Sequence, residues 1–264
     1  MKKELGYYHS IIVFIITMVA MVYVAAPMQH YLGMTGLALT ELMLGFIAIF
    51  AVAVLRADFK KVFPFKVPPP SMFFASLTFY AGIYILNLAL GSVISELFPA
   101  SNEFSESITA FVAGTPPALT VIIMAVMPAI FEELLHRGVI LAGFKHLRRT
   151  WVIVLCCGVT FGIFHLDRYR FLPTAVLGCA LAYISLKTDS LLINMIMHFL
   201  NNLISVIAIF SLNGVDTSEI EQTAQVSIWP AVIYLAIIGA VLVMIGIRKM
   251  RKVSKQIEQA KFQS

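Results

Sequence analysis

The chain contains repeated runs of apolar residues, each close to the length that a helix needs to cross a lipid bilayer. A transmembrane helix takes roughly 20 predominantly apolar residues. Eight segments approach or reach this length, although the fifth and sixth are short. They are Ile11–Ala26, Met34–Leu55, Met72–Leu97, Ala118–Phe144, Trp151–His165, Leu172–Leu186, Leu191–Leu212 and Ile228–Ile247. The sequence therefore predicts an all-α, polytopic integral membrane protein with about eight transmembrane helices in one bundle.

The overall composition supports a lipid-facing surface. Apolar residues make up 60% of the chain and charged residues 12%, whereas a soluble domain is nearer half apolar and a quarter charged. No repeat, low-complexity tract or long linker divides the sequence. We therefore expect a single membrane domain over residues 1–264. Lys2 and Lys3 before the first segment resemble a signal peptide, but Pro27 follows the only suitable cleavage site, which favours an uncleaved helix.

Lysine and arginine are distributed unevenly between the predicted loops. One side carries Lys2, Lys3, Arg56, Lys60, Lys61, Lys66, Lys145, Arg148, Arg149, Lys187 and the tail residues Arg248, Lys249, Arg251, Lys252, Lys255 and Lys261. The other side carries Arg168 and Arg170 with Glu96, Glu103, Glu106, Asp216, Glu219 and Glu221. Because cytoplasmic loops are enriched in Lys and Arg, we expect a multi-pass protein of the cell membrane with both termini cytoplasmic. The net charge of +5 is then a topology signal, with membrane lipid and no nucleic acid as partner, and the basic tail 248–264 would contact anionic headgroups.

Ionisable side chains inside the predicted spans gather in the second half of the chain. Such residues are costly in lipid, so each one is a candidate for a functional site. Glu133 and Arg137 are spaced i, i+4 on a helix and can neutralise each other. Glu132 would then be the carboxylate that is free for chemistry. Glu41, in the second span, is interpreted as structural.

Two later spans add further polar groups. The fifth span ends in Phe161-Gly-Ile-Phe-His165, and the seventh contains His198 and Asn202. The latter two are also spaced i, i+4 and can present their side chains to one point. Each motif by itself fits an interfacial histidine or an interhelical hydrogen bond, but the set favours an active site.

In this order the three motifs resemble those of the CPBP intramembrane proteases, the family that groups the CAAX prenyl-endopeptidases with bacteriocin-processing and immunity enzymes. The resemblance covers about Pro117–Ile209, and the first three spans carry no motif of the family. It implies hydrolysis of a peptide bond in a membrane-associated or lipidated peptide. By analogy Glu132 is the general base, helped by His165, while His198 and Asn202 stabilise the oxyanion. Glu133 and Arg137 hold the geometry.

Several alternatives stay open at this point. Glu132, His165 and His198 are also a possible zinc-ligand set, but the HExxH spacing is absent, and we favour a site with no cofactor over one with a divalent metal. The same polar cluster can dock a peptide or a sensor kinase in a non-catalytic membrane partner or immunity protein. A transporter would show internal repeats, and the absence of a repeat in this sequence argues against that function. The substrate, its prenylation and the oligomeric state are not specified by the sequence.

The predicted depths of the site residues conflict with one another. At 1.5 Å per residue, Glu132 and His198 would lie roughly 10–15 Å from the cytoplasmic face and His165 some ~20 Å. Straight, perpendicular helices would keep the three apart. Helix tilt, a fifth helix that begins outside the bilayer plane, or a break around Asp167–Pro173 would bring them together.

Overall fold

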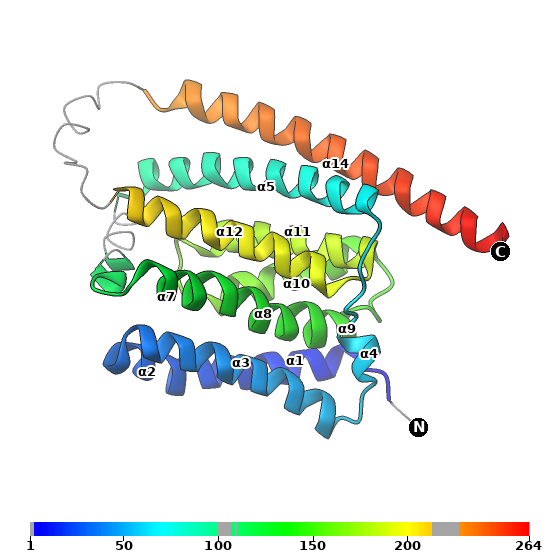
Figure 1. Ribbon diagram of the computed structural model, residues 1–264, viewed down its shortest axis with the longest axis horizontal. Coiled ribbons are helices and arrows are strands. Elements are labelled where there is room, and N and C mark those ends of the chain that lie inside the picture. Colours follow the sequence, from blue (N-terminus) through cyan, green and yellow to red (C-terminus); the bar gives the residue numbers. More distant parts are fainter. Residues whose placement is uncertain (1–2, 100–106, 109, 213–226, 264) are drawn as a thin grey trace.

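The computed structural model describes residues 3–99, 107–108, 110–212 and 227–263, and these residues form a helical bundle without a β-strand (Figure 1). The predicted all-α membrane fold is confirmed. In chain order the elements are α1 (Tyr7–Ala20), η1 (Met21–Ala25), α2 (Ala26–Leu32), α3 (Met34–Val54), α4 (Phe59–Val62), α5 (Pro70–Leu97), α7 (Pro117–Val121), η2 (Ile122–Val126), α8 (Met127–Glu133), η3 (Leu134–Ile140), α9 (Leu141–Phe144), α10 (Thr150–Phe164), α11 (Phe171–Thr188), α12 (Leu191–Leu212) and α14 (Trp229–Gln263). The η elements are π-helical turns that continue the helices on either side of them.

All eight predicted segments are helical, but only seven of the helices described are long and apolar enough to cross a membrane. The exception is α10, the fifth predicted span, which has 15 residues. At 1.5 Å per residue it reaches about 22 Å, less than the ~30 Å hydrocarbon core. The helix α10 is therefore a shorter arm, joined to α11 by the turn 165–170.

The outer surface of the bundle is apolar. On α14, Ile233, Tyr234 and Ile237 are 58%, 66% and 59% exposed, and exposed isoleucines and phenylalanines cover α1 and α3 in the same way. In water such a surface would be unfavourable, at roughly 25 cal/mol per Å² of apolar area. In a bilayer it is the surface that contacts the acyl chains.

The start of α1 and the end of α14 lie at the same end of the bundle (Figure 1). We name this end the basic end, because its loops and helix termini carry Lys3, Lys60, Lys61, Lys66, Lys145 and Lys187. Of the acidic residues predicted for the other end, Glu96 alone lies within the described residues.

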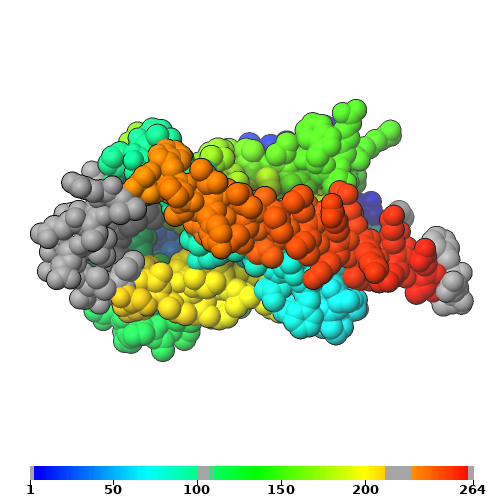
Figure 2. Space-filling view, turned by 90° about the horizontal axis from the view of Figure 1, so that it is seen from above, coloured from blue at the N-terminus to red at the C-terminus, as the bar shows by residue number. Residues whose placement is uncertain are grey.

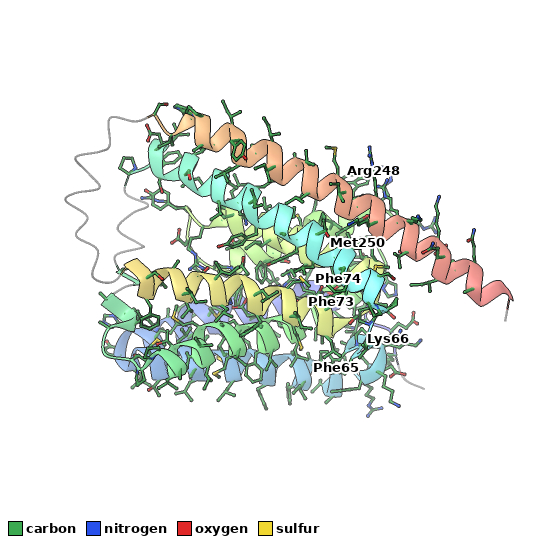
Figure 3. All side chains as sticks on the ribbon, turned by 45° about the horizontal axis from the view of Figure 1, so that its top comes forward. Phe65, Lys66, Phe73, Phe74, Arg248 and Met250 are labelled. Atoms are coloured by element: carbon green, nitrogen blue, oxygen red, sulfur yellow. The ribbon has the colours of Figure 1, made fainter. Side chains whose placement is uncertain are left out.

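The long helix α14 runs along the outside of the bundle (Figure 2) and packs on α5. Met250 is fully buried in this contact and belongs to an apolar cluster against which Phe73 of α5 packs, whereas Arg248 is exposed (Figure 3). The two helices approach closely because small residues face each other. A Cβ atom added at Gly82 would lie only 2.7 Å from the backbone nitrogen of Val243. Small residues at such crossings let membrane helices associate through van der Waals contact.

This close approach predicts that Gly82→Ala separates α5 from α14 and destabilises the protein by about 1–3 kcal/mol, the usual range for overpacking. Gly91→Ala on the same helix is the matched control, because a Cβ there meets nothing within 4 Å. That control should leave the stability unchanged or raise it by up to about 1 kcal/mol through helix propensity. Thermal unfolding of the purified proteins in detergent measures both, and equal melting temperatures for the two variants would contradict the packing account.

Candidate active site

The helix that carries the two glutamates is widened by π-helical turns on both sides of them. Pro128 has no N–H and cannot continue the regular hydrogen-bond ladder. Just before it, the N–H of Met127 bonds to the carbonyl of Ile122, five residues back. After Glu133 the second π-helical turn, η3, follows at once. Such turns re-aim the side chains of a helix and often occur at functional sites.

Glu133 is the centre of a buried ion-pair network. Its Oε1 accepts from Nη1 of Arg137 at 2.9 Å and from Nδ1 of His198 at 2.8 Å. The Glu133 and Arg137 side chains are only 0% and 1% exposed. The i, i+4 pair expected from the sequence is therefore present, and it is extended to a third residue on α12. Because a carboxylate only accepts, Nδ1 of His198 carries a proton and the ring orientation is fixed.

Glu132 lines a cavity. Its side chain is 9% exposed, and its Oε2 lies 3.9 Å from Nε2 of His198, beyond hydrogen-bond distance. Among the described residues, this Oε2 has no hydrogen-bond partner. The second carboxylate of the pair is thus available to a water molecule or a peptide.

His165 is placed by the tight hairpin of α10 and α11. Gly158, Gly162 and Gly178 allow the contact, since a Cβ at any of them would lie within 3 Å of the other helix. The turn follows at once, and its direction is set by Leu166, whose backbone is left-handed at φ 52°. Nδ1 of His165 lies 2.8 Å from the carbonyl of Phe161. This nitrogen must donate, so the lone pair of the neutral ring is on Nε2.

Asn202 is oriented by its neighbour. Nδ2 of Asn201 donates to Oδ1 of Asn202 at 3.1 Å, which leaves the Nδ2 group of Asn202 as a donor. Both side chains line the same cavity as Glu132 and His198. The i, i+4 spacing from His198 identified Asn202 from the sequence, whereas no spacing assigned a role to Asn201, and the contact between the two side chains was not predicted.

Phe161 joins the polar groups of three helices. Its ring centroid is 4.9 Å from that of His165 and 5.8 Å from that of His198. The guanidinium of Arg137 lies over the ring at 4.4 Å, a favourable cation–π contact. His136, which is 2% exposed, packs edge-on at 4.9 Å. The sequence motif contained Phe161 one helical turn before His165, so the i, i+4 spacing could have indicated this supporting role.

Glu132, His165, His198 and Asn202 line one cavity of about 510 Å³. The structure thus brings together the four residues that the sequence singled out. Glu41 of α3, interpreted from the sequence as structural, also lines this cavity. It is 3% exposed, and its Oε2 has no hydrogen-bond partner among the described residues. Glu41 therefore contributes a second buried carboxylate to the wall.

The starting points of the helices resolve the predicted conflict of depth. At 1.5 Å per residue, Glu132 lies about 18 Å from the end of α9 and His165 about 22 Å from the start of α10. Helix α12 begins inside the protein: Leu191 is 1% exposed, and its N–H donates to the carbonyl of Pro64. A loop thus covers the start of α12, so that His198 lies deeper than its position in the helix indicates.

Glu132, His165 and His198 were considered from the sequence as a zinc-ligand set. Among the described residues, no group of three or more His, Cys, Asp or Glu side chains is arranged to hold a metal ion. Nδ1 of each of the two site histidines is bonded within the protein, so Nε2 is the ring nitrogen that faces other groups. As placed, the three side chains are not grouped around a metal position, and we derive no step through a metal.

The buried network predicts a large effect for Arg137→Ala. Removing one partner of a buried ion pair leaves an uncompensated charge and costs about 3–5 kcal/mol. Lys61→Ala is the control, since Lys61 pairs with Glu4 at the surface with side chains 69% and 68% exposed, where a pair contributes at most about 1 kcal/mol. Thermal unfolding in detergent measures both variants, and the melting temperature should fall much further for Arg137→Ala than for Lys61→Ala. An Arg137→Ala protein as stable as Lys61→Ala would mean that the network does not hold the site together.

Comparison with known proteins agrees with the motifs. Residues 114–204, roughly a third of the chain, match the family model described as type II CAAX prenyl endopeptidase Rce1-like. No curated protein and no solved structure matches the chain. At the family level the match indicates a membrane protease, a hydrolase. It confirms the resemblance to the CPBP intramembrane proteases for the segment that carries Glu132, His165, His198 and Asn202.

Proposed function

We propose that this protein is an intramembrane endopeptidase in which Glu132 activates water. The observation that carries the proposal is the convergence of Glu132, His165, His198 and Asn202 on one cavity inside the bundle. A carboxylate with an unpartnered oxygen and a histidine with a free ring nitrogen are the groups that general-base hydrolysis needs. The substrate is a membrane-associated or lipidated peptide.

In the proposed reaction Glu132 takes a proton from water, and the hydroxide adds to the carbonyl carbon of the scissile bond. The lone pair on Nε2 of His165 accepts a hydrogen bond from this water and positions it. The negative charge that develops on the carbonyl oxygen is met by Nδ2 of Asn202 and by Nε2–H of His198 in its doubly protonated form. When the intermediate collapses, the C–N bond breaks and Glu132 returns the proton to the leaving amine.

Glu133 and Arg137 act on this reaction through His198. The carboxylate of Glu133 accepts a hydrogen bond from Nδ1 and so fixes the orientation of the His198 ring. Arg137 forms an ion pair with Glu133 and neutralises the charge of its carboxylate. An oriented donor of this kind contributes about 3 kcal/mol to stabilisation of the transition state. We further propose that both termini face the cytoplasm, because the basic end carries them.

Glu132→Gln should abolish cleavage, because the amide has the size of the carboxylate but takes no proton. The expected loss is about 10²–10⁴-fold, measured as the disappearance of peptide termini from the membrane and secreted proteomes at equal protein levels. Glu96→Gln, an exposed change outside the cavity, should leave the termini of the wild type. Identical termini for wild type and Glu132→Gln, with both proteins folded, would instead favour a non-catalytic membrane protein that docks a peptide or a sensor kinase.

Chelators test the metal-free mechanism. We expect peptide cleavage by the purified protein to continue in EDTA and in 1,10-phenanthroline, since no metal takes part in the proposed steps. Loss of activity that is restored by added zinc would contradict this mechanism. That result would mean that Glu132, His165 and His198 act as metal ligands.

A further inference from the structure

The site cavity extends from the catalytic residues toward one end of the bundle only. Beyond Glu132 and His198 its wall continues through Gln29, Phe111 and Ile209. Each of these lies near the end of its segment that is opposite to the basic end: Gln29 comes four residues before Gly33, and Ile209 three before the end of α12. The cavity therefore leads away from the end that carries the termini.

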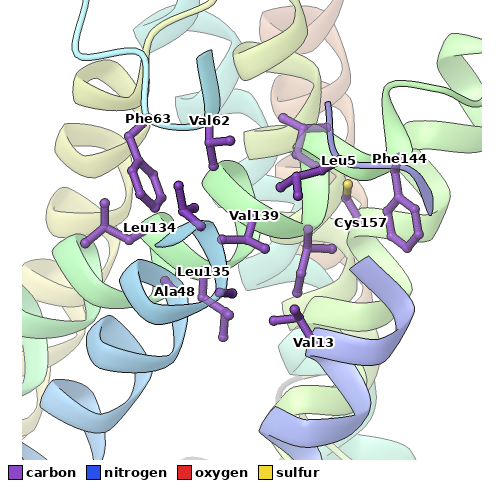
Figure 4. Close-up of a cluster of buried hydrophobic side chains, with 14 of the residues drawn as sticks. Leu5, Val13, Ala48, Val62, Phe63, Leu134, Leu135, Val139, Phe144 and Cys157 are labelled. Atoms are coloured by element: carbon purple, nitrogen blue, oxygen red, sulfur yellow. The ribbon is translucent and has the colours of Figure 1, made fainter. Parts of the chain in front are cut away.

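Toward the basic end the path is closed by apolar side chains. Leu134, Leu135 and Val139 follow the glutamates along the helix and are at most 7% exposed. Val62 and Phe63 cover them from the outside (Figure 4). The contact leaves no free space, because a Cβ added at Gly138 would lie 2.4 Å from the ring of Phe63.

The basic end has a pocket of its own that does not communicate with the site. It has a volume of about 340 Å³ and is lined by charged residues that include Lys3, Asp58, Lys145 and Asp189. None of its lining residues also lines the site cavity. The closed end is thus also the cationic end, which the distribution of lysine and arginine assigns to the cytoplasm.

We infer that the site receives its peptide from the extracytoplasmic side of the membrane. Its substrates are then exported peptides, or the outer segments of membrane-anchored ones, and not the ends of cytoplasmic proteins. This inference rests on the proposed proteolytic function, and it adds the direction of access and the class of substrate.

The depth of the cavity sets a further requirement for the substrate. Eleven residues of α12 separate His198 from Ile209, which corresponds to about 16 Å. An extended chain covers this distance with about five residues at ~3.3 Å each. A peptide that reaches Glu132 in extended form through this cavity therefore needs at least this length.

Thiol labelling tests the direction of access without requiring activity. Ser205→Cys places a thiol in the cavity wall, and Ile207→Cys is the matched control two residues further along α12, where the side chain is 54% exposed to lipid and does not line the cavity. In intact cells a membrane-impermeant maleimide should label Ser205→Cys several-fold more than either Ile207→Cys or the wild type, which reports the native cysteines.

Lys145→Cys at the basic end reports the opposite side. It should react only after the membrane is permeabilised. The inference is overturned if Ser205→Cys also requires permeabilisation, if it reacts no more than Ile207→Cys, or if Lys145→Cys reacts in intact cells.

The positions of cleavage separate this inference from the proposed function. We expect the peptide termini that depend on Glu132 to lie on exported or extracytoplasmic segments. Glu132-dependent termini confined to cytoplasmic proteins would support proteolysis and overturn the inference. If Ser205→Cys is labelled in intact cells and no terminus depends on Glu132, the direction of access stands while the proteolytic function and its substrate class fail.

Discussion

The buried contact of Glu133 with Arg137 and His198 is the interaction on which the rest of the site depends. Two adjacent carboxylates in an apolar interior are unfavourable unless one of them is neutralised. Arg137 and His198 both bond to the same oxygen of Glu133, and this leaves Glu132 facing the cavity. Because His198 belongs to α12, the network also joins the glutamate helix to a second arm of the bundle. The catalytic arrangement and the packing of these helices therefore both depend on the Glu133 carboxylate.

Around this network the fold places polar groups by local distortions of helices. The π-helical turns on both sides of the glutamates change which side chains face inward. The glycine-lined contact of the short arm α10 with α11 brings Phe161 and His165 against Arg137 and His198. The apolar cluster on the basic side keeps the opposite face of the network closed. A polar cavity that extends from the network toward one end of the bundle follows from these three features.

The sequence predicted the parts of this arrangement that depend on local spacing. Apolar segments of membrane length identified the helices, and the i, i+4 rule identified the pair of Glu133 and Arg137. The contact of Glu133 with His198 was missed because it joins residues 65 positions apart. The position of Glu41 in the cavity wall was missed for the same reason.

The depths of the side chains also escaped prediction. They depend on where each helix begins relative to the others, and hydropathy sets such limits only loosely. In α12 the start is fixed by a contact with a distant loop, through Leu191 and Pro64. Similarly, the fifth segment is apolar but forms a helix of only 15 residues, shorter than the expected full crossing.

The most direct test of the central claim is an experimental structure of the Glu132→Gln protein in lipid with a bound substrate peptide. The account predicts that the scissile carbonyl oxygen lies about 3 Å from Nδ2 of Asn202, within reach of an oriented donor. It also predicts that the peptide leaves the cavity past Ser205 and Ile209. A peptide that reaches the protein from the basic end, past Phe63, or that binds away from residue 132, would contradict the account.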